Sequence, residues 1–490
     1  MDLRRRPFAA VLFLSAAVFL MEQRIHGEAA VPPENLVFEV RNKFAGKREK
    51  ELSALRAHDV RRHARLLSAV DLPLGGDSEP ESIGLYFTKI GLGTPARDFY
   101  VQVDTGSDIL WVNCAGCIRC PRKSELGVQL TLYDKDTSST AKSITCDDKF
   151  CSLISEKSEC RSGSTCQYVI VYGDHSSTNG YFVRDIVHLD LVTGNLQTGS
   201  TNGTVVFGCG FKQSGQLGES GSALDGIMGF GQSNSSFISQ LASQGKVKRA
   251  FAHCLDNNNG GGIFAIGEVV SPKVKNAPMV PNEVHYSVVV KGIKVGNSIL
   301  EFPSNAFDTE GNRGAIIDSG TTLAYLPDTV YEPLLNEILV AKPGISLHSV
   351  QDTFMCFHYT AEPDSFPPVT FEFENSLSLT VHPREYLFEL QENIWCFGWQ
   401  NGGVQTKAGG SLTILGDMAL SNKLVVYDIE KQVIGWTNHN CSEGIQVKDE
   451  ASGAVYTVGA HNLSSSSSLI VIKLLMFFSL LITLLSNFTR

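Results

Sequence analysis

Short apolar and β-branched runs of five to eight residues alternate with Gly, Asn and Ser clusters through the middle of the chain, as in GLYFTKIGLG, YVQVDTGS, YSVVVKGIKVG and LVVYDIE. Runs of this length between turn-forming residues are typical of β-strands. One helical pattern stands out, in which Phe237, Ile238 and Leu241 follow the candidate caps Asn234 and Ser235. The pattern therefore predicts a mainly β fold.

The first 75 residues do not show this β pattern. Three arginines at positions 4–6 precede an apolar stretch from Phe8 to Leu20, and small residues follow. That order is typical of a secretory signal peptide, which we expect over residues 1–29. From residue 30 to 75 charged residues are interleaved with Leu and Val without turn signals, which predicts a partly helical pro-segment.

The C-terminal end also resembles a processing signal. Five serines at 464–468 precede an apolar run from Leu469 to Leu485, and no basic segment follows. Small residues before a terminal hydrophobic tail are typical of a GPI signal. We expect a linker over 446–468 with attachment at Ser464, a tail over 469–490 that is removed on anchoring, and a protein on the outer face of the plasma membrane. A plain transmembrane anchor is the competing interpretation, at the lower limit of spanning length.

Composition and charge narrow the function classes. A chain of 490 residues with 43% hydrophobic residues can bury one large core or two. Its net charge of -10 argues against a nucleic-acid binder. Residues 1–75 are basic, with 13 Lys+Arg against 9 Asp+Glu. This predicts that the pro-segment docks on an acidic body, although surface charge that serves solubility is the plainer interpretation.

The twelve cysteines indicate disulfides rather than metal ligands, because the chain is expected to be secreted. Cys114, Cys117 and Cys120 would otherwise suggest an iron–sulfur or zinc site, and no metal is expected. The cysteine spacing does not choose the pairings. Glycosylation triplets at Asn202, Asn234, Asn440 and Asn462 fit the same secretory route.

A tetrad of Asp, hydroxyl residue, Gly and hydroxyl residue occurs twice behind an apolar strand, as Asp104-Thr105-Gly106-Ser107 and Asp318-Ser319-Gly320-Thr321. One such turn is weak evidence, since Asp and Gly are ordinary turn residues. Each tetrad is followed by an apolar-apolar-Gly element, Ile227-Met228-Gly229 or Ile414-Leu415-Gly416. The repetition predicts two homologous β lobes that each offer one aspartate.

A pair of aspartates has a specific chemical use. Two adjacent carboxyl groups cannot both ionise cheaply, so they share one proton and their two pKa values separate. The ionised partner can take a proton from water while the protonated partner donates toward a carbonyl oxygen. This predicts peptide-bond hydrolysis without a covalent intermediate and without a cofactor.

The segments DTGSDILWV, VIVYGDHSSTNGYF, ALDGIMGFG, IIDSGTT and LTILGDM occur in the order found in pepsin-type aspartic endopeptidases, which the chain resembles from residue 84 to 445. The resemblance implies a bilobal acid-protease fold with an N-terminal lobe over 76–280, a C-terminal lobe over 281–445 and the active-site cleft between them. It also implies an acidic pH optimum, polypeptide substrates and a monomer.

The resemblance assigns roles to individual residues. Asp104 and Asp318 would be the catalytic pair, and Gly106 and Gly320 would allow the tight turns beside them. The remaining residues would support this pair: Ser107 and Thr321 by bonding the outer carboxylate oxygens, Thr105 and Ser319 by linking the two loops, Tyr172 as the tyrosine of a mobile flap, and Trp111 by positioning that tyrosine.

Within this family the cysteine pattern resembles the plant nepenthesin-like branch, including FGCG at Cys209 and FAHCL at Cys254. That similarity implies six pairs: Cys114–Cys117, Cys120–Cys209, Cys146–Cys166, Cys151–Cys160, Cys254–Cys441 and Cys356–Cys396. The basic segment before residue 75 resembles an inhibitory propeptide of the family.

Three functions compete at this point. The first is an acid endopeptidase anchored outside the cell. The second is a catalytically silent relative that acts as a cell-surface binding protein or inhibitor, because a fold does not fix a function. The third is a disulfide-rich structural protein without a catalytic cleft. Both tetrads and the flap tyrosine are intact, which favours the endopeptidase.

Overall fold

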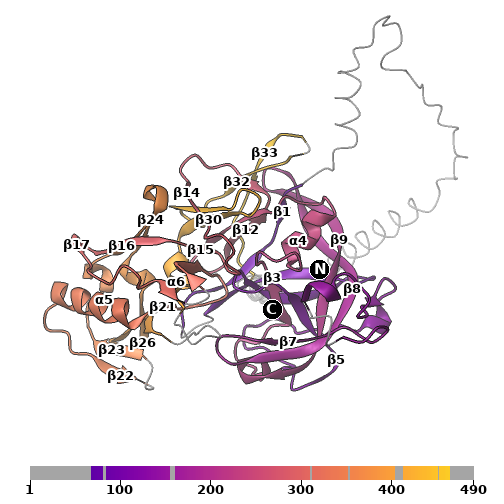
Figure 1. Ribbon diagram of the computed structural model, residues 1–490, viewed down its shortest axis with the longest axis horizontal. Helices are drawn as coiled ribbons and strands as arrows, with labels where there is room; N and C mark the ends of the chain where they lie inside the picture. Colours follow the sequence, from indigo (N-terminus) through magenta and orange to yellow (C-terminus); the bar gives the residue numbers. More distant parts are fainter. Residues whose placement is uncertain are drawn as a thin grey trace, which may run out of the picture. The chain divides into compact units, whose positions relative to one another are not determined.

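The computed structural model describes residues 68–80, 84–154, 160–309, 312–350, 354–402, 412–450 and 452–463 (Figure 1). The expected signal peptide, most of the expected pro-segment, Ser464 and the hydrophobic tail lie outside these residues. No helix within the described ranges is long and apolar enough to cross a membrane. The fold is mainly β, as the hydrophobic pattern predicts.

The largest sheet has 15 strands and contains most of the first half of the chain. Its main path is β14-β31-β30-β11-β12-β1-β8-β9-β5-β10-β4-β3-β2, and β6 and β7 pair with β8. The bounds are β1 Val70–Asp71, β2 Leu74–Asp77, β3 Leu85–Leu92, β4 Arg97–Asp104, β5 Leu110–Ile118, β6 Lys142–Ser143, β7 Gln167–Val171, β8 Ser177–Gly194, β9 Gln197–Ser214, β10 Gly226–Gly229, β11 Ala250–Leu255, β12 Gly262–Ile266, β14 Lys275–Pro278, β30 Lys423–Asp428 and β31 Val433–Asn438.

Outside β14, β30 and β31 the second half forms smaller sheets, several of them drawn in orange in Figure 1. A five-stranded sheet carries the second aspartate, with β15 Ser287–Val288, β20 Ala315–Ile317, β29 Ile414–Leu415, β21 Ala324–Leu326 and β28 Trp399–Asn401. Two four-stranded sheets contain β17 Ser298–Ile299, β16 Val290–Val295, β24 Val369–Phe373 and β25 Ser378–Val381, and β22 His348–Val350, β23 Phe354–His358, β27 Ile394–Phe397 and β26 Leu387–Gln391. The remaining two are β13 Glu268–Val269 with β32 Ile445–Lys448 and β33 Val455–Val458, and β18 Asp308–Thr309 with β19 Asn312–Arg313.

Helices are few and short among the described residues. The predicted helix is present as α4 (Phe237–Ser243), but its N-cap is Ser236, whose hydroxyl accepts from the backbone N–H of Ser239, and not Asn234 or Ser235. The 14-residue helix α5 (Asp328–Ala341) was not predicted. The other two are α3 (Cys151–Ile154) and α6 (Asp417–Leu420).

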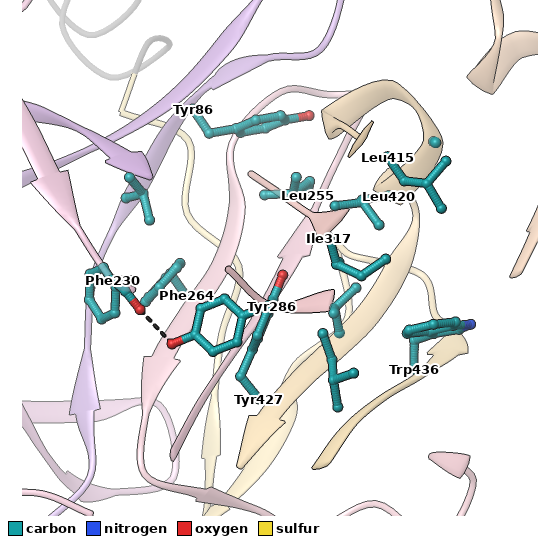
Figure 2. Close-up of a cluster of buried hydrophobic side chains, with 14 of the residues drawn as sticks. Tyr86, Phe230, Leu255, Phe264, Tyr286, Ile317, Leu415, Leu420, Tyr427 and Trp436 are labelled. Atoms are coloured by element: carbon teal, nitrogen blue, oxygen red, sulfur yellow. Dashed lines mark hydrogen bonds between the residues drawn. The ribbon is translucent and has the colours of Figure 1, made fainter. Parts of the chain in front are cut away.

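The two halves of the chain share strands at their junction. β30 from the second half pairs with β11 from the first half, over Ala250–Cys254 opposite Leu424–Asp428. An aromatic cluster lies in this region (Figure 2). The Phe251 and Tyr427 rings stack at 4.4 Å, and Phe230 and Phe264 lie 4.7 Å apart. Aromatic pairs of this kind each stabilise the fold by about 0.5–1.5 kcal/mol beyond the burial of apolar area. The junction between the two halves is therefore well packed.

Both ends of the described chain are more ordered than the sequence predicts. β1 and β2 belong to the large sheet although they begin within the expected pro-segment. The expected linker is wrong as far as residue 463, because β32 and β33 pair with each other and Leu463 N–H donates to Leu74 O at 2.9 Å. Backbone groups of β32, β33, His461 and Leu463 are thus bonded within the folded body, whereas a free linker would leave them to water.

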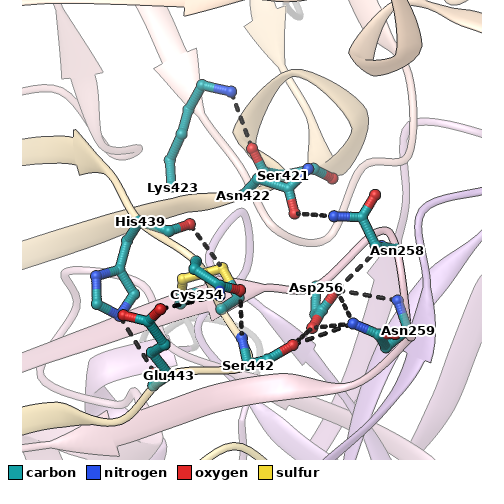
Figure 3. The surroundings of a disulfide bond; sticks show 12 residues. Cys254, Asp256, Asn258, Asn259, Ser421, Asn422, Lys423, His439, Ser442 and Glu443 are labelled. Carbon is teal, nitrogen blue, oxygen red and sulfur yellow. Dashed lines mark hydrogen bonds between the residues drawn. A yellow bond between two sulfur atoms is a disulfide. The ribbon is translucent and has the colours of Figure 1, made fainter.

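The six disulfides use all twelve cysteines. Cys254–Cys441 and Cys356–Cys396 agree with the implied pairs. Figure 3 shows the surroundings of the former.

Two implied pairs near β5 are wrong, namely Cys114–Cys117 and Cys120–Cys209. The structure pairs Cys114 with Cys209 and Cys117 with Cys120. β5 runs parallel to β9 with Val112 opposite Cys209, which brings Cys114 to a Cα–Cα distance of 5.4 Å from Cys209. This spacing suits a disulfide, whereas register between strands cannot be read from cysteine spacing.

The pairing among Cys146, Cys151, Cys160 and Cys166 also differs from the implied pairs, Cys146–Cys166 and Cys151–Cys160. Cys151 pairs with Cys166, and Cys146 pairs with Cys160. Burial explains the choice, because Cys151 and Cys166 are both buried in an aromatic-lined cluster while Cys146 and Cys160 are only half-buried. The sulfur atoms of Cys146, Cys151 and Cys160 lie close together, but each belongs to a disulfide.

Candidate active site

The two tetrads follow equivalent pairs of strands. β4 runs parallel to β10 with Asp104 opposite Gly229, and Phe230 N–H donates to Asp104 O at 2.7 Å. In the second half β20 runs parallel to β29, and Asp318 N–H donates to Leu415 O at 3.1 Å. Each apolar-apolar-Gly element therefore lies in the parallel strand that pairs with the strand ending at the aspartate, and the backbone hydrogen bond at the aspartate holds that end in place.

The two carboxylates are held by matching hydrogen bonds. Asp104 Oδ1 accepts from Gly106 N–H at 2.8 Å, and its Oδ2 accepts from Ser107 Oγ at 2.6 Å. Asp318 Oδ1 accepts from Gly320 N–H at 2.8 Å, and its Oδ2 accepts from Thr321 Oγ1 at 2.7 Å. Both carboxyl groups are buried, and each keeps one orientation because both of its oxygens are bonded.

The glycines at the centre of each tetrad are required by close approach. A Cβ at Gly106 would lie 2.6 Å from Asp318 Oδ2, and a Cβ at Gly320 would lie 2.0 Å from Asp104 Oδ1. Both distances are far below a van der Waals contact, so each loop reaches the opposite carboxylate only because this residue lacks a side chain. The crossed contacts also show that the two loops bring the two aspartates together.

Hydroxyl groups connect the loops beneath the carboxylates. Ser319 N–H donates to Thr105 Oγ1 at 2.8 Å, and Thr105 Oγ1 lies 3.4 Å from both Ile317 O and Asp318 Oδ1. On the other side Ser319 Oγ lies 3.4 Å from Val103 O. Thr105 and Ser319 are thus placed as the sequence analysis expects, with the tighter contacts at Thr105.

The electrostatics of the pair favour one shared proton. Burial, followed by the nearby charge of Asp318, raises the pKa of Asp104 to about 7. Hydrogen bonds from Ser107 and the backbone of Gly106 act in the opposite direction and are outweighed. The pair therefore holds one proton at acid pH, so that one carboxyl group is neutral while the other is ionised.

Tyr172 and Trp111 are in contact as expected. Tyr172 follows β7 at the tip of the β7–β8 hairpin, where its N–H donates to Ser176 O at 2.9 Å. The indole Nε1–H of the buried Trp111 donates to Tyr172 Oη at 2.7 Å. Burial and the charge of Asp104 raise the pKa of Tyr172 well above its usual value, so its hydroxyl stays protonated.

Asp417 and Tyr427 have no role predicted from the sequence. Asp417 is fully buried, and neither of its carboxylate oxygens has a partner among the described residues. Burial and then the charges of Asp318 and Asp104 raise its pKa well above the usual range. The sequence signal for Asp417 was its position directly after Ile414-Leu415-Gly416. Tyr427 lies in an apolar run whose pattern predicts only a buried core strand.

The glycosylation triplets lie mostly at the surface. Asn202, Asn234 and Asn440 are exposed, while Asn462 is half-buried and its side-chain N–H donates to Asn259 O at 2.6 Å. Whether any of the four carries a glycan stays a prediction.

Comparisons with known proteins agree with this geometry. Residues 86–268 match the family described as "Xylanase inhibitor N-terminal", and residues 285–438 match "Xylanase inhibitor C-terminal". Aspartic proteinase 36 of Arabidopsis thaliana is 56% identical over 93% of this chain and 94% of its own length. Aspartic proteinase 39 of the same plant is 54% identical over 92% and 94%.

Solved structures show the same fold at low identity. The crystal structure of edgp has a TM-score of 0.60 at 21% identity, covering 76% of this chain and 95% of that one. Conglutin gamma, a basic 7S globulin from lupine seeds, gives 0.60 at 19% identity, with the same coverage. The two family models and the two relatives show that the chain belongs to the pepsin-like aspartic proteinases of the xylanase-inhibitor type.

Proposed function

We propose that this protein is an aspartic endopeptidase that hydrolyses peptide bonds at acid pH. The observation that carries the proposal is the pair of buried carboxylates, Asp104 and Asp318, held in equivalent hydrogen-bond frames with the pKa of Asp104 raised to about 7. Two carboxyl groups in such a frame supply one acid and one base within reach of a single substrate carbonyl.

The chemistry follows from the protonation states. The ionised carboxylate of the Asp104–Asp318 pair takes a proton from a water molecule that attacks the scissile carbonyl carbon, and the neutral carboxyl group of the pair donates its proton toward the carbonyl oxygen. A tetrahedral diol forms, and collapse of that diol with proton transfer to the nitrogen releases two peptides. Tyr172, held by Trp111 at the hairpin tip, closes over the bound substrate and excludes water from the reacting groups.

A direct test is to express the full chain, acidify it and follow cleavage of an unfolded protein with and without pepstatin. The proposal predicts cleavage that pepstatin blocks. Cleavage that is insensitive to pepstatin and persists in Asp104→Asn would assign the activity to another site or to a contaminant.

We further propose that the chain is a member of the nepenthesin-like branch, is made as a zymogen with the basic segment before residue 75 as its inhibitor, and is held on the outer face of the plasma membrane by a GPI anchor near Ser464. The N-terminal and C-terminal sequence patterns support this. Phosphatidylinositol-specific phospholipase C treatment of intact cells should release the protein. Retention, with Asn487–Arg490 still detectable by mass spectrometry, would show a spanning helix.

A second candidate function is that of a catalytically silent binding or inhibitor protein at the cell surface. The observation that favours it is the match of both halves to families described as xylanase inhibitors. A xylanase inhibition assay with wild type and with Asp104→Asn separates the two. Equal inhibition by both proteins, with no acid cleavage by wild type, would support the second function and contradict the first.

A further inference from the structure

A buried ion pair lies close to the end of α6. Lys423 at the start of β30 and Glu385 in the turn Pro383–Glu385 have side chains that are 1% and 7% exposed, and Lys423 Nζ lies 2.7 Å from Glu385 Oε2. No other ion pair within the described residues is as deeply buried on both sides. Apolar residues of similar size often fit such a place equally well, so the charged pair points to a use for one of its hydrogen bonds.

Lys423 holds the C-terminal end of α6. Its ammonium group donates to Ser421 O at 2.9 Å (Figure 3). Ser421 is the C-cap of α6, and its Oγ donates to Asp417 O at 2.7 Å. Carbonyl oxygens at the C-terminal end of a helix lack partners within the helix, and a cation is favourable there.

The N-terminal end of α6 holds the second tetrad. Asp417 N–H donates to Thr321 O at 2.7 Å, and Met418 N–H donates to Thr322 O at 3.1 Å. Thr321 is the residue whose Oγ1 donates to Asp318 Oδ2 at 2.7 Å. The backbone of α6 therefore supports the loop that orients the Asp318 carboxylate.

Close packing couples the position of α6 to that of the loop. A Cβ at Gly416, the residue before α6, would lie 2.3 Å from Thr321 O and 2.2 Å from Leu323 O. On the core side Leu420 is fully buried in the same cluster as Ile317, the residue before Asp318 (Figure 2). A displacement of α6 must therefore displace the loop as well.

Glu385 keeps the ammonium group charged in the interior. Burial lowers the pKa of Lys423, whereas the charge of Glu385 and its hydrogen bond act in the opposite direction. Glu385 Oε2 is itself oriented by His382 N–H, which donates to it at 2.8 Å. The buried cation thus has a counter-charge and a second oxygen acceptor, as a buried charge requires.

We propose that Lys423, held by Glu385, is a positioning residue that fixes α6 and thereby the orientation of the Asp318 carboxylate. Each step of the path is a hydrogen bond, from Lys423 to Ser421, to Asp417, to Thr321 and to Asp318. The proposal rests on the proposed endopeptidase function for its effect on the rate. Lys423 and Glu385 act through α6 and not on the reacting atoms.

The first test replaces both charges by apolar side chains, as Lys423→Met with Glu385→Leu. Such a replacement often leaves stability unchanged, so we expect Tm within about 5 °C of wild type. The bond to Ser421 O is lost, and we expect kcat to fall about tenfold with KM within about twofold. A kcat within about twofold of wild type in the folded double variant would overturn the proposal.

The matched control is Lys248→Met with Glu268→Leu. Lys248 Nζ lies 2.6 Å from Glu268 Oε2, and the two side chains are 18% and 30% exposed. Neither residue bonds α6 or a tetrad in the part of the chain that the structure describes. We expect this variant to keep the wild-type kcat. An equal loss of kcat would contradict a specific role for Lys423.

The second test keeps the ion pair and breaks the next link. Ser421→Ala removes the hydroxyl that donates to Asp417 O, and we expect kcat to fall about threefold with KM unchanged. Combined with the replacement of the pair, it should lower kcat no further, because both changes interrupt one path.

Ser236→Ala is the control for Ser421→Ala, since Ser236 is equally buried and its hydroxyl caps α4. Additive losses in the combined variant, or an equal loss of kcat in Ser236→Ala, would refute the path. Ser421→Ala against Ser236→Ala also decides the question if the variant without the ion pair does not fold.

A third readout does not require activity. The N–H groups of Asp417 and Met418 donate to the loop, so their hydrogen exchange should be faster in the variant without the Lys423–Glu385 pair and unchanged in the control variant without Lys248–Glu268. If wild type cleaves nothing at acid pH, the endopeptidase proposal fails while this measurement still decides on the positioning role. Unchanged exchange at both amides contradicts that role whatever the activity.

Discussion

Gly320→Ala tests whether the crossed contact between the loops sets the catalytic geometry. The added Cβ would lie 2.0 Å from Asp104 Oδ1 and 2.5 Å from its Cγ, whereas Cβ contacts under 3.0 Å essentially never occur. The Asp104 carboxylate must therefore move by at least 3.0 − 2.0 = 1.0 Å, or the two loops must separate by as much. A 1 Å displacement of a catalytic group costs about 100-fold in rate.

The expected result is a fall in kcat of about 100-fold or more, with a loss of stability limited to about 1–3 kcal/mol because one methyl group is added at a loop. The assay is steady-state cleavage of a peptide at acid pH, beside thermal unfolding of the same samples. Gly221→Ala is the matched control, since no atom lies within 4 Å of the position of its Cβ. Full activity of folded Gly320→Ala would refute the argument that this contact fixes Asp104.

Three further outcomes follow from the same structure. Burial raises the pKa of both Asp104 and Asp225 to about 7, above the unfolded value, so the stability that these two neutral carboxyl groups contribute is present below about pH 4 and is lost as the pH rises to 7; scanning calorimetry should show Tm falling over that range, and a flat Tm would contradict it. Tyr172→Ala should lower kcat/KM far more than Tm, and the reverse result in parallel kinetic and melting assays would show a packing role. Replacing Cys254 and Cys441 by Ala opens a link between residues 187 apart and should cost about 5 kcal/mol in denaturant unfolding, whereas a loss under about 1 kcal/mol would contradict the chain-entropy account.

The active-site tetrads could be predicted because the constraint is local. An Asp-Thr/Ser-Gly turn must place its own N–H and hydroxyl groups around one carboxylate, and this arrangement is determined within four residues. The short apolar and β-branched runs between turn-forming residues likewise predict the β fold. α5 was missed because Pro333 lies inside it, and a proline is unfavourable in a helix interior.

The disulfide exchanges and the folded C-terminal segment could not be predicted because they depend on contacts between distant segments. Cys114 meets Cys209 only through the β5–β9 register, and Leu463 meets Leu74 across the whole length of the folded chain. Spacing along the chain carries no information on such pairings.

The most direct test of the central claim is the pH dependence of kcat/KM for one peptide, measured on wild type, Asp104→Asn and Asp318→Asn at matched folded concentration. The claim predicts a profile confined to acid pH for wild type, with activity lost as the pH rises toward 7 and the shared proton leaves Asp104, and no measurable cleavage by either variant. Cleavage by folded Asp318→Asn at any pH, or a wild-type rate that keeps rising above pH 7, would contradict it.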